Sequence, residues 1–231
     1  MGDRGENVRP APLSAAQRSV SFVEFAIGAA IVIAHNVFHV VPNEVPILFV
    51  LCIASVRLRE GSFAALGLNR PRSWWMTIGL AFVTAALVIA IGEFVTDPLA
   101  HYLGLRATNA GAKALGTGKG DVASALKGLG LVWTFAAFGE ELGYRRYLLG
   151  RAADGLGGSG AAYGIALVAA SLLFGGGHFY QGPAGMFTTA IDGFIIGAAY
   201  LVSGRNLWVA VLAHGLIDTT GIALLFFGLA D

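Results

Sequence analysis

The stretch WWMTIGLAFVTAALVIAIGEFV (residues 74–95) contains a single charged residue, Glu93. A helix of about 20 apolar residues crosses the hydrocarbon core of a bilayer, so this stretch predicts a transmembrane helix. The chain holds further stretches of this kind, and together they predict an all-α, multi-pass transmembrane bundle of about seven spans (six to eight). We expect the spans at 20–41, 46–57, 74–95, 128–150, 159–178, 185–203 and 206–229, the second being the shortest.

The composition favours a membrane protein as well. Of the 231 residues, 56% are hydrophobic and 13% are charged, whereas a soluble domain carries about 25% charged residues. The net charge of +1 argues against a nucleic-acid partner held by phosphate contacts. Residues 1–19 are polar and predict a disordered cytoplasmic tail, followed by a single transmembrane domain over 20–231.

The distribution of basic residues predicts the orientation, because cytoplasmic loops of membrane proteins are enriched in Lys and Arg. A cytoplasmic N-terminus places four basic residues outside, namely Arg106, Lys113, Lys119 and Lys127. It places eleven inside, namely Arg4, Arg9, Arg18, Arg57, Arg59, Arg70, Arg72, Arg145, Arg146, Arg151 and Arg205. We therefore expect a plasma (inner) membrane protein with its N-terminus in the cytoplasm and its C-terminus outside.

Ionisable residues inside membrane helices are rare and are by default functional candidates. Glu140 and Glu141 are adjacent in the expected fourth span, and Arg145 follows Glu141 at the i, i+4 spacing that brings opposite charges together. Pairing of Glu141 with Arg145 leaves Glu140 without a local cation and able to accept a proton, which is the role of a general base. The alternative is a structural ion-pair network near the interface.

Two further polar motifs follow in later spans. His178 ends the sequence FGGGH (174–178), where three glycines permit close helix approach or a break in the helix. His214 and Asp218 share one face of the last span at i, i+4 spacing. Each histidine alone is more simply explained as an interfacial or internally bonded residue, but a Glu/His/His/Asp set on three helices is typical of an active site.

Weaker candidates lie elsewhere in the spans. His35 and His39, at i, i+4 in the first span, form a possible metal pair, and Asp192 could line a cavity. The single cysteine, Cys52, lies in an apolar run and cannot form an internal disulfide.

The order Glu-Glu-x-x-x-Arg, Phe-x-x-x-His and His-x-x-x-Asn/Asp on successive membrane helices resembles the CPBP family. This family comprises the CAAX proteases and bacteriocin-processing enzymes, and it includes the prenyl-protein endopeptidases of the Ras-converting type. The resemblance covers about 125–220, with the motifs EELGYR (140–145), FGGGH (174–178) and HGLID (214–218). It implies an active site between the last four helices.

The resemblance also implies roles for these residues. Glu140 and His178 would activate a water molecule that attacks a peptide bond of a membrane-associated protein or peptide. His214 and Asp218 would stabilise the oxyanion, while Glu141 and Arg145 would be structural. The expected enzyme is an intramembrane endopeptidase of the glutamate type, without a cofactor.

Asp218 leaves alternatives open, because an ionised carboxylate cannot donate a hydrogen bond to an oxyanion. Asp218 would have to be protonated, to orient His214, or to take part in a metal site. Glu140, His178 and His214 would form a plausible zinc set, so a metalloprotease is the alternative chemistry. A non-catalytic membrane protein that binds a peptide or partner is the alternative function, and a proton-coupled transporter is a third.

The depth of the residues poses a further question. A straight fifth helix from Ser159 would place His178 near the outer surface, whereas Glu140 would lie near the middle of the membrane. Tilt, a later helix start or a break at 175–177 would bring them together.

Overall fold

The computed structural model describes residues 13–108, 110 and 118–229, and within these ranges all regular structure is helical. The N-terminal half contains α1 (Ala15–Asn36), α2 (Glu44–Glu60), the 3₁₀ turn η1 (Phe63–Leu66), α3 (Trp74–Ile91), the π-helical η2 (Gly92–Thr96) and α4 (Asp97–Tyr102). The C-terminal half contains α6 (Val122–Leu131), the π-helical η3 (Val132–Leu149), α7 (Gly150–Gly155), α8 (Gly160–Gly176), the 3₁₀ turn η4 (Phe179–Gln181), α9 (Gly182–Val202) and α10 (Leu207–Phe227).

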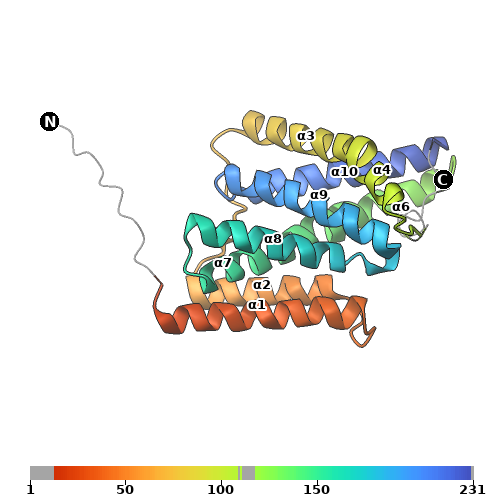
Figure 1. The fold of residues 1–231 in the computed structure, drawn as a ribbon. Helices are drawn as coiled ribbons and strands as arrows, with labels where there is room; N and C mark the ends of the chain where they lie inside the picture. Colours follow the sequence, from red (N-terminus) through yellow and green to blue (C-terminus); the bar gives the residue numbers. More distant parts are fainter. Residues whose placement is uncertain (1–12, 109, 111–117, 230–231) are drawn as a thin grey trace.

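The predicted multi-pass bundle is confirmed. Among the described residues, five helical segments are long and apolar enough to cross a membrane: Ala15–Asn36, Trp74–Tyr102, Val122–Gly155, Phe179–Val202 and Leu207–Phe227. The apolar helix α8 is shorter, at 17 residues, and α2 is equally short and ends in charged residues. Successive helices run back and forth along the bundle, so α1 begins at one end and α10 ends at the other (Figure 1).

Several helix boundaries differ from the expected ones. α1 begins at Ala15, because Ser14 and Gln17 form a capping box ahead of the apolar run; the rest of the predicted tail, residues 1–12, lies outside the described part. The third span continues to Tyr102, since Pro98 lies in the first turn of α4, where a proline is tolerated. The fourth begins at Val122, capped by Asp121. The connection expected between the third and fourth spans is therefore shortened at both ends, and Lys113 within it lies outside the described ranges.

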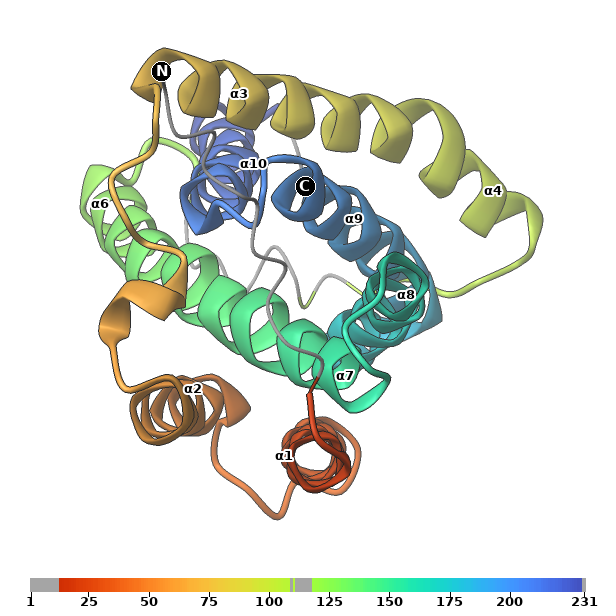
Figure 2. The same ribbon diagram turned by 90° about the vertical axis from the view of Figure 1, so that its left-hand side faces the viewer.

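The segment α6–η3–α7 lies at the centre of the bundle, with α1 and α2 on one side and α3, α9 and α10 on the other (Figure 2). Glycines allow its close approach to α2. A Cβ at Gly139 would lie 2.8 Å from Val45 Cγ1, and one at Gly143 would lie 3.1 Å from Leu48 Cβ. The central helix is the one that carries Glu140 and Glu141, so the packing places both carboxylates inside the bundle.

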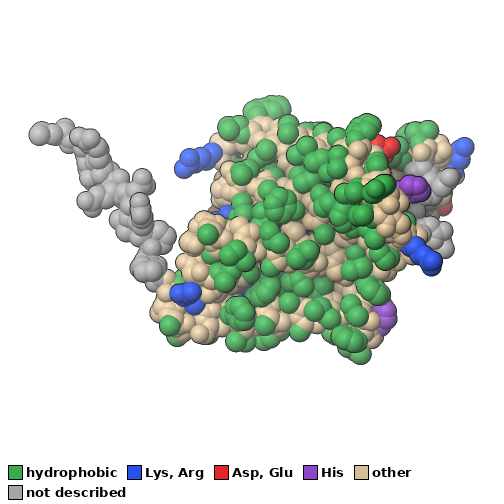
Figure 3. All heavy atoms as spheres, in the orientation of Figure 1, with side chains coloured by type: hydrophobic (Ala, Val, Ile, Leu, Met, Phe, Trp, Pro, Cys, Tyr) green, Lys and Arg blue, Asp and Glu red, His purple; other side chains and the backbone are tan. Residues whose placement is uncertain are grey.

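The outer surface is apolar along the length of the helices. Large side chains such as Trp75, Phe94 and Leu172 are mostly exposed, and the face in Figure 3 is largely hydrophobic, with Lys and Arg near its two ends. An apolar surface of this extent is unfavourable in water and favourable against lipid. The chain is a multi-pass membrane protein.

Basic residues gather at one end of the bundle, which we call the Arg-rich end and define by residues 57–73, 155–159 and 203–206. Contacts across it include the backbone hydrogen bond from Leu207 N to Gly67 O (3.1 Å). Arg151 is buried beneath it and lies 2.9 Å from Glu60 and 3.2 Å from Glu24. One of the eleven arginines assigned to the cytoplasm, Arg145, does not belong there, because it lies in the bundle interior and is only 2% exposed.

Candidate active site

Both acidic candidates lie on η3, whose backbone is π-helical over Val132–Leu149. The π-helix is rare and often occurs at functional sites. Its wider i→i+5 hydrogen bonding still allows Glu141 and Arg145 to meet, four residues apart. The central helix therefore presents two carboxylates and a guanidinium to the space between α8, α9 and α10.

Glu141 is engaged on two sides. Its Oε1 lies 3.0 Å from Arg145 Nη1, as an ion pair, and 2.8 Å from His214 Nδ1. The Glu141 and Arg145 side chains are 0% and 2% exposed. Arg145 also donates from Nη2 to the Gly193 carbonyl of α9 (3.2 Å), and its guanidinium lies 4.4 Å from the centre of the Phe174 ring. The expected Glu141–Arg145 pair is thus present, and it also joins η3 to α8, α9 and α10.

His214 lies between two carboxylates, that of Asp218 on its own helix and that of Glu141 on η3. Its Nδ1 faces Glu141, and its Nε2 lies 3.5 Å from Asp218 Oδ2, at ion-pair distance. Because Glu141 is paired with an arginine, which is always charged, it accepts a hydrogen bond and His214 Nδ1 donates it. The residue that orients His214 is therefore Glu141, on the neighbouring helix, and the Nε2 side of the ring faces Asp218.

Glu140, next to this ion pair, makes no hydrogen bond or ion pair with any residue in the described ranges. Its Oε2 is buried without a partner there. The ionisable groups within electrostatic range of Glu140 are His214, Asp218, Glu141 and Glu44. An unpartnered buried polar atom is uncommon in proteins, and Glu141 Oε2 also lacks a hydrogen-bond partner among the described residues. Glu140 differs from Glu141 in that neither of its oxygens is engaged there, so it is the carboxylate of the pair that is free to bind a water molecule or a substrate.

His178 follows the end of α8, which continues without a break through Gly176. Its ring turns back along the helix, and Nδ1 lies 2.8 Å from the carbonyl oxygen of Phe174. The Phe174 ring lies 4.8 Å from the His178 ring and 5.9 Å from the His214 ring, centre to centre. His214 and Arg145 are within electrostatic range of His178.

The glycines of FGGGH bring helices together and do not break α8. A Cβ at Gly175 would clash with Met186 O of α9, and one at Gly177 would lie 2.6 Å from Tyr144 Oη. The depth difference that the sequence raised remains. His178 follows the end of α8, at the end of the bundle opposite the Arg-rich end, while Glu140 lies midway along the segment α6–η3–α7.

Asp192, which is outside the main motifs, lies close to this region. Asp192 on α9 is half-buried, and its Oδ1 has no hydrogen-bond partner among the described residues. His214, Asp218 and Arg145 are within its electrostatic range, so Asp192 lies near the site, as the sequence suggested. The cavity described below, in contrast, is lined by none of the four predicted catalytic residues.

Glu44, at the start of α2, is a site residue that the sequence analysis missed. It is only 6% exposed and accepts a hydrogen bond from Asn36 Nδ2 (3.2 Å), while His35 Nε2 lies 3.2 Å from its other oxygen. Its Oε1 and the hydroxyl of Tyr144, on η3, both lie beside Gly177. An acidic residue in the first turn of a helix is normally explained by its favourable interaction with the helix dipole. For Glu44, only the buried partners indicate another role.

The sequence suggested two sets of metal ligands, His35 with His39 and Glu140 with His178 and His214. His35 uses both ring nitrogens, on Glu44 and on the Val41 carbonyl (2.7 Å), so the suggested His35–His39 pair does not form. Within the described part of the chain no group of three His, Cys, Asp or Glu side chains is arranged to hold a metal ion. Glu140, His178 and His214 are thus not among such a group in the described residues.

Comparison with known proteins adds the family. The model of the family described as "Type II CAAX prenyl endopeptidase Rce1-like" matches residues 123–220. No curated protein and no solved structure gives a significant match to the chain. The matched segment runs from α6 into α10 and contains Glu140, Glu141, Arg145, His178, His214 and Asp218. Residues 123–220 are therefore similar to the Rce1-like family of type II CAAX prenyl endopeptidases, in agreement with the resemblance seen in the three motifs.

Proposed function

We propose that the protein is an intramembrane endopeptidase in which Glu140 is the general base. The observation that carries the proposal is the difference between two adjacent carboxylates. Glu141 Oε1 is engaged by Arg145 and His214, and only its Oε2 has no partner in the described residues, whereas neither oxygen of Glu140 is engaged there. A general base needs a free lone pair, and the unengaged carboxylate of Glu140 supports that role.

The proposed reaction is hydrolysis of a peptide bond. Glu140, helped by His178, removes a proton from water while the water oxygen bonds to the carbonyl carbon, and the carbonyl π electrons move to oxygen. The tetrahedral intermediate then collapses, the C–N bond breaks, and the leaving amine takes the proton from Glu140. Water is the only co-reactant, and no step requires a metal.

His214 and Asp218 would stabilise the oxyanion. With Nδ1 donating to Glu141, His214 can donate from Nε2 to the oxyanion only when the ring carries both protons. Asp218, 3.5 Å from Nε2, is placed to balance the charge of that imidazolium. This arrangement gives the carboxylate a role beside the donor and does not require it to donate to the oxyanion itself.

The substrate class follows from the family name. A type II CAAX prenyl endopeptidase acts on prenylated CAAX sequences, and we propose that this chain cleaves a lipidated C-terminal peptide at the membrane. The apolar outer surface would let the lipid approach from the bilayer.

The test uses the purified protein in nanodiscs with a farnesylated CAAX peptide and its unlipidated counterpart as probes. We expect cleavage of the farnesylated peptide by the wild type, insensitivity to 1,10-phenanthroline, and no cleavage by Glu140→Gln. Loss of activity on chelation with recovery by zinc would replace the glutamate mechanism by the metal alternative. No cleavage of either peptide by a folded wild-type protein would favour the non-catalytic binding function.

A further inference from the structure

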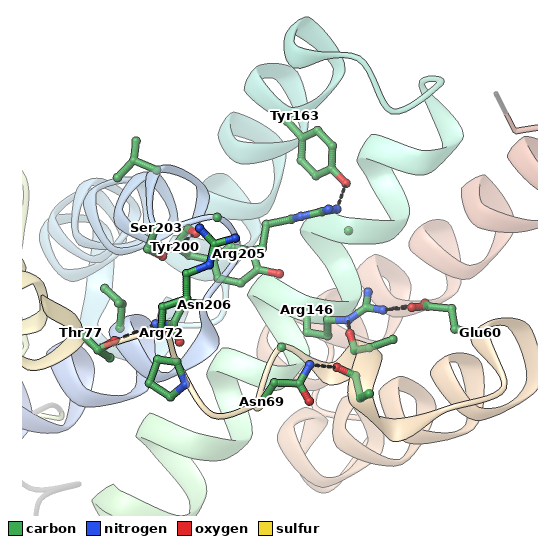
Figure 4. A pocket seen from close by; sticks show the side chains of 18 of the residues that line it. Glu60, Asn69, Arg72, Thr77, Arg146, Tyr163, Tyr200, Ser203, Arg205 and Asn206 are labelled. Carbon is green, nitrogen blue, oxygen red and sulfur yellow. Dashed lines mark hydrogen bonds and ion pairs between the residues drawn. The ribbon is translucent and has the colours of Figure 1, made fainter. Parts of the chain in front are cut away.

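A cavity of about 1210 Å³ opens at the Arg-rich end of the bundle. It lies between the connection from η1 to α3, the α7 region and the connection from α9 to α10. Figure 4 shows Arg146 and Glu60 on one side of it and Arg72, Asn206 and Arg205 on the other. Its lining shares no residue with the Glu140 site, so its chemistry is separate from the proposed hydrolysis.

The cavity lining carries more positive than negative charge. Two acidic residues line it, Glu60 and Asp154, against six arginines: Arg59, Arg70, Arg72, Arg146, Arg151 and Arg205. Arg59, Arg146 and Arg151 are paired with carboxylates. Arg70, Arg72 and Arg205 are exposed and form no ion pair with any residue that the structure describes. Three guanidinium groups thus surround the opening without a counter-charge.

Arg205 has an unusual backbone conformation, and its side chain is held by a hydrogen bond to Tyr163. Its φ is 65°, in the left-handed region that residues other than glycine rarely adopt, and it directly follows Gly204 in the turn that ends α9. The side chain donates from Nη1 to Tyr163 Oη at 2.6 Å, a contact visible in Figure 4. A charged residue kept where glycine would be unstrained indicates a function for that charge.

The opposite wall supplies neutral polar groups and apolar surface. Asn206 donates to Thr77 Oγ1 (3.0 Å), and Met76, Leu80 and Val209 line the same side. The guanidinium group of arginine forms paired hydrogen bonds with phosphate oxygens, and apolar residues beside it can pack against an acyl chain. Basic pockets between transmembrane helices at the membrane surface bind the headgroups of anionic lipids.

We propose that this cavity binds a phosphate group, carried by an anionic glycerophospholipid whose headgroup meets Arg70, Arg72 and Arg205. The shared chemistry with a free phosphate ion is the phosphate itself. The apolar wall favours the lipid as its bearer, because an ion would leave that wall without a partner.

The test measures binding of phosphatidylglycerol and phosphatidylcholine to the purified protein by native mass spectrometry, with inorganic phosphate as competitor. The variant Arg70→Gln/Arg72→Gln/Arg205→Asn should bind phosphatidylglycerol roughly a hundredfold more weakly, since each surface cation contributes about fivefold. Binding of phosphatidylcholine should not change. Arg57→Gln is the matched control, because Arg57 is an exposed arginine at the same end that does not line the cavity.

A single change, Arg72→Gln, should weaken phosphatidylglycerol binding more than Arg57→Gln, and it decides the question if the triple variant is unstable. Competition by inorganic phosphate supports phosphate recognition; binding of phosphate without binding of the lipid would make the free ion the ligand. Equal effects of Arg57→Gln and Arg72→Gln, or unchanged binding by a folded triple variant, would overturn the proposal.

Discussion

At the scale of single residues, the adjacent carboxylates Glu140 and Glu141 have opposite environments. Glu141 is fully buried and bound to a cation and an imidazole, whereas Glu140 is half-buried and has no partner among the described residues. Sequence spacing predicted the Glu141–Arg145 pair. It could not reveal that Glu141 also orients His214, because that contact joins residues 73 positions apart.

Removing one member of the buried ion pair should destabilise the fold. We expect Arg145→Met to lower the free energy of unfolding by roughly 3–5 kcal/mol, because it leaves Glu141 as a buried charge without its cation. Glu141→Gln/Arg145→Met, which removes both charges, should be more stable than Arg145→Met alone. Thermal unfolding of the purified variants in detergent measures both. Equal stability of Arg145→Met and the wild type would contradict the account.

Glu44 allows a second prediction at this scale. Glu44→Gln keeps the shape but removes the charge that faces His35 and lies, with the Tyr144 hydroxyl, beside Gly177. Tyr144 packs edge-on against Phe174 (5.0 Å), whose ring contacts that of His178. We expect lower kcat on the farnesylated peptide with a smaller change in KM, because a displaced His178 affects the chemical step. Glu93→Gln, a change at a glutamate on η2, is the control and should leave kcat unchanged. An unaltered kcat in Glu44→Gln would exclude the positioning role.

At the scale of helices, α8 shows how glycines serve packing. The sequence left open whether FGGGH breaks the helix or permits close approach, and the structure shows an unbroken α8 with backbone atoms of α9 pressed against Gly175. The choice depends on which helix lies opposite, and a single sequence does not contain that information.

Two alanine substitutions in α8 should therefore have opposite effects. Gly175→Ala should destabilise the protein by about 1–3 kcal/mol, because its Cβ would meet the Met186 carbonyl and Ala190, and backbone must move. Gly164→Ala is the matched control in the same helix, with nothing within 4 Å of its Cβ. It should be neutral or stabilising by at most about 1 kcal/mol. Thermal unfolding tests both, and a destabilisation of equal size in the two variants would contradict the packing role.

At the scale of the whole molecule, the grouping of basic residues predicts orientation. We expect the Arg-rich end in the cytoplasm. Cys52, the single cysteine of the chain, is fully buried. Maleimide labelling should therefore come from the cysteine added at an exposed position. Leu103→Cys should react with a membrane-impermeant maleimide on intact cells, and Ser62→Cys only after permeabilisation. The unmodified chain is the control for background labelling. The reverse pattern would show that the N-terminus is outside.

Hydropathy predicted the bundle and the approximate spans, because apolar length is encoded locally. It missed the continuation of the third span to Tyr102 and the start of the fourth at Val122, where polar or small residues extend a helix beyond its apolar core. The motif residues were all named from spacing and resemblance, and the family match spans them; their catalytic roles stay predictions. Glu44 and the Arg-rich cavity were not, because each depends on segments that are distant in sequence.

The central claim is that Glu140, and not Glu141, is the base that activates water. The most direct measurement compares Glu140→Gln and Glu141→Gln for both peptide cleavage and thermal stability. The account predicts that Glu140→Gln retains the wild-type unfolding temperature and loses cleavage, while Glu141→Gln unfolds at lower temperature because Arg145 loses its counter-charge. Full cleavage by a stably folded Glu140→Gln variant would contradict it.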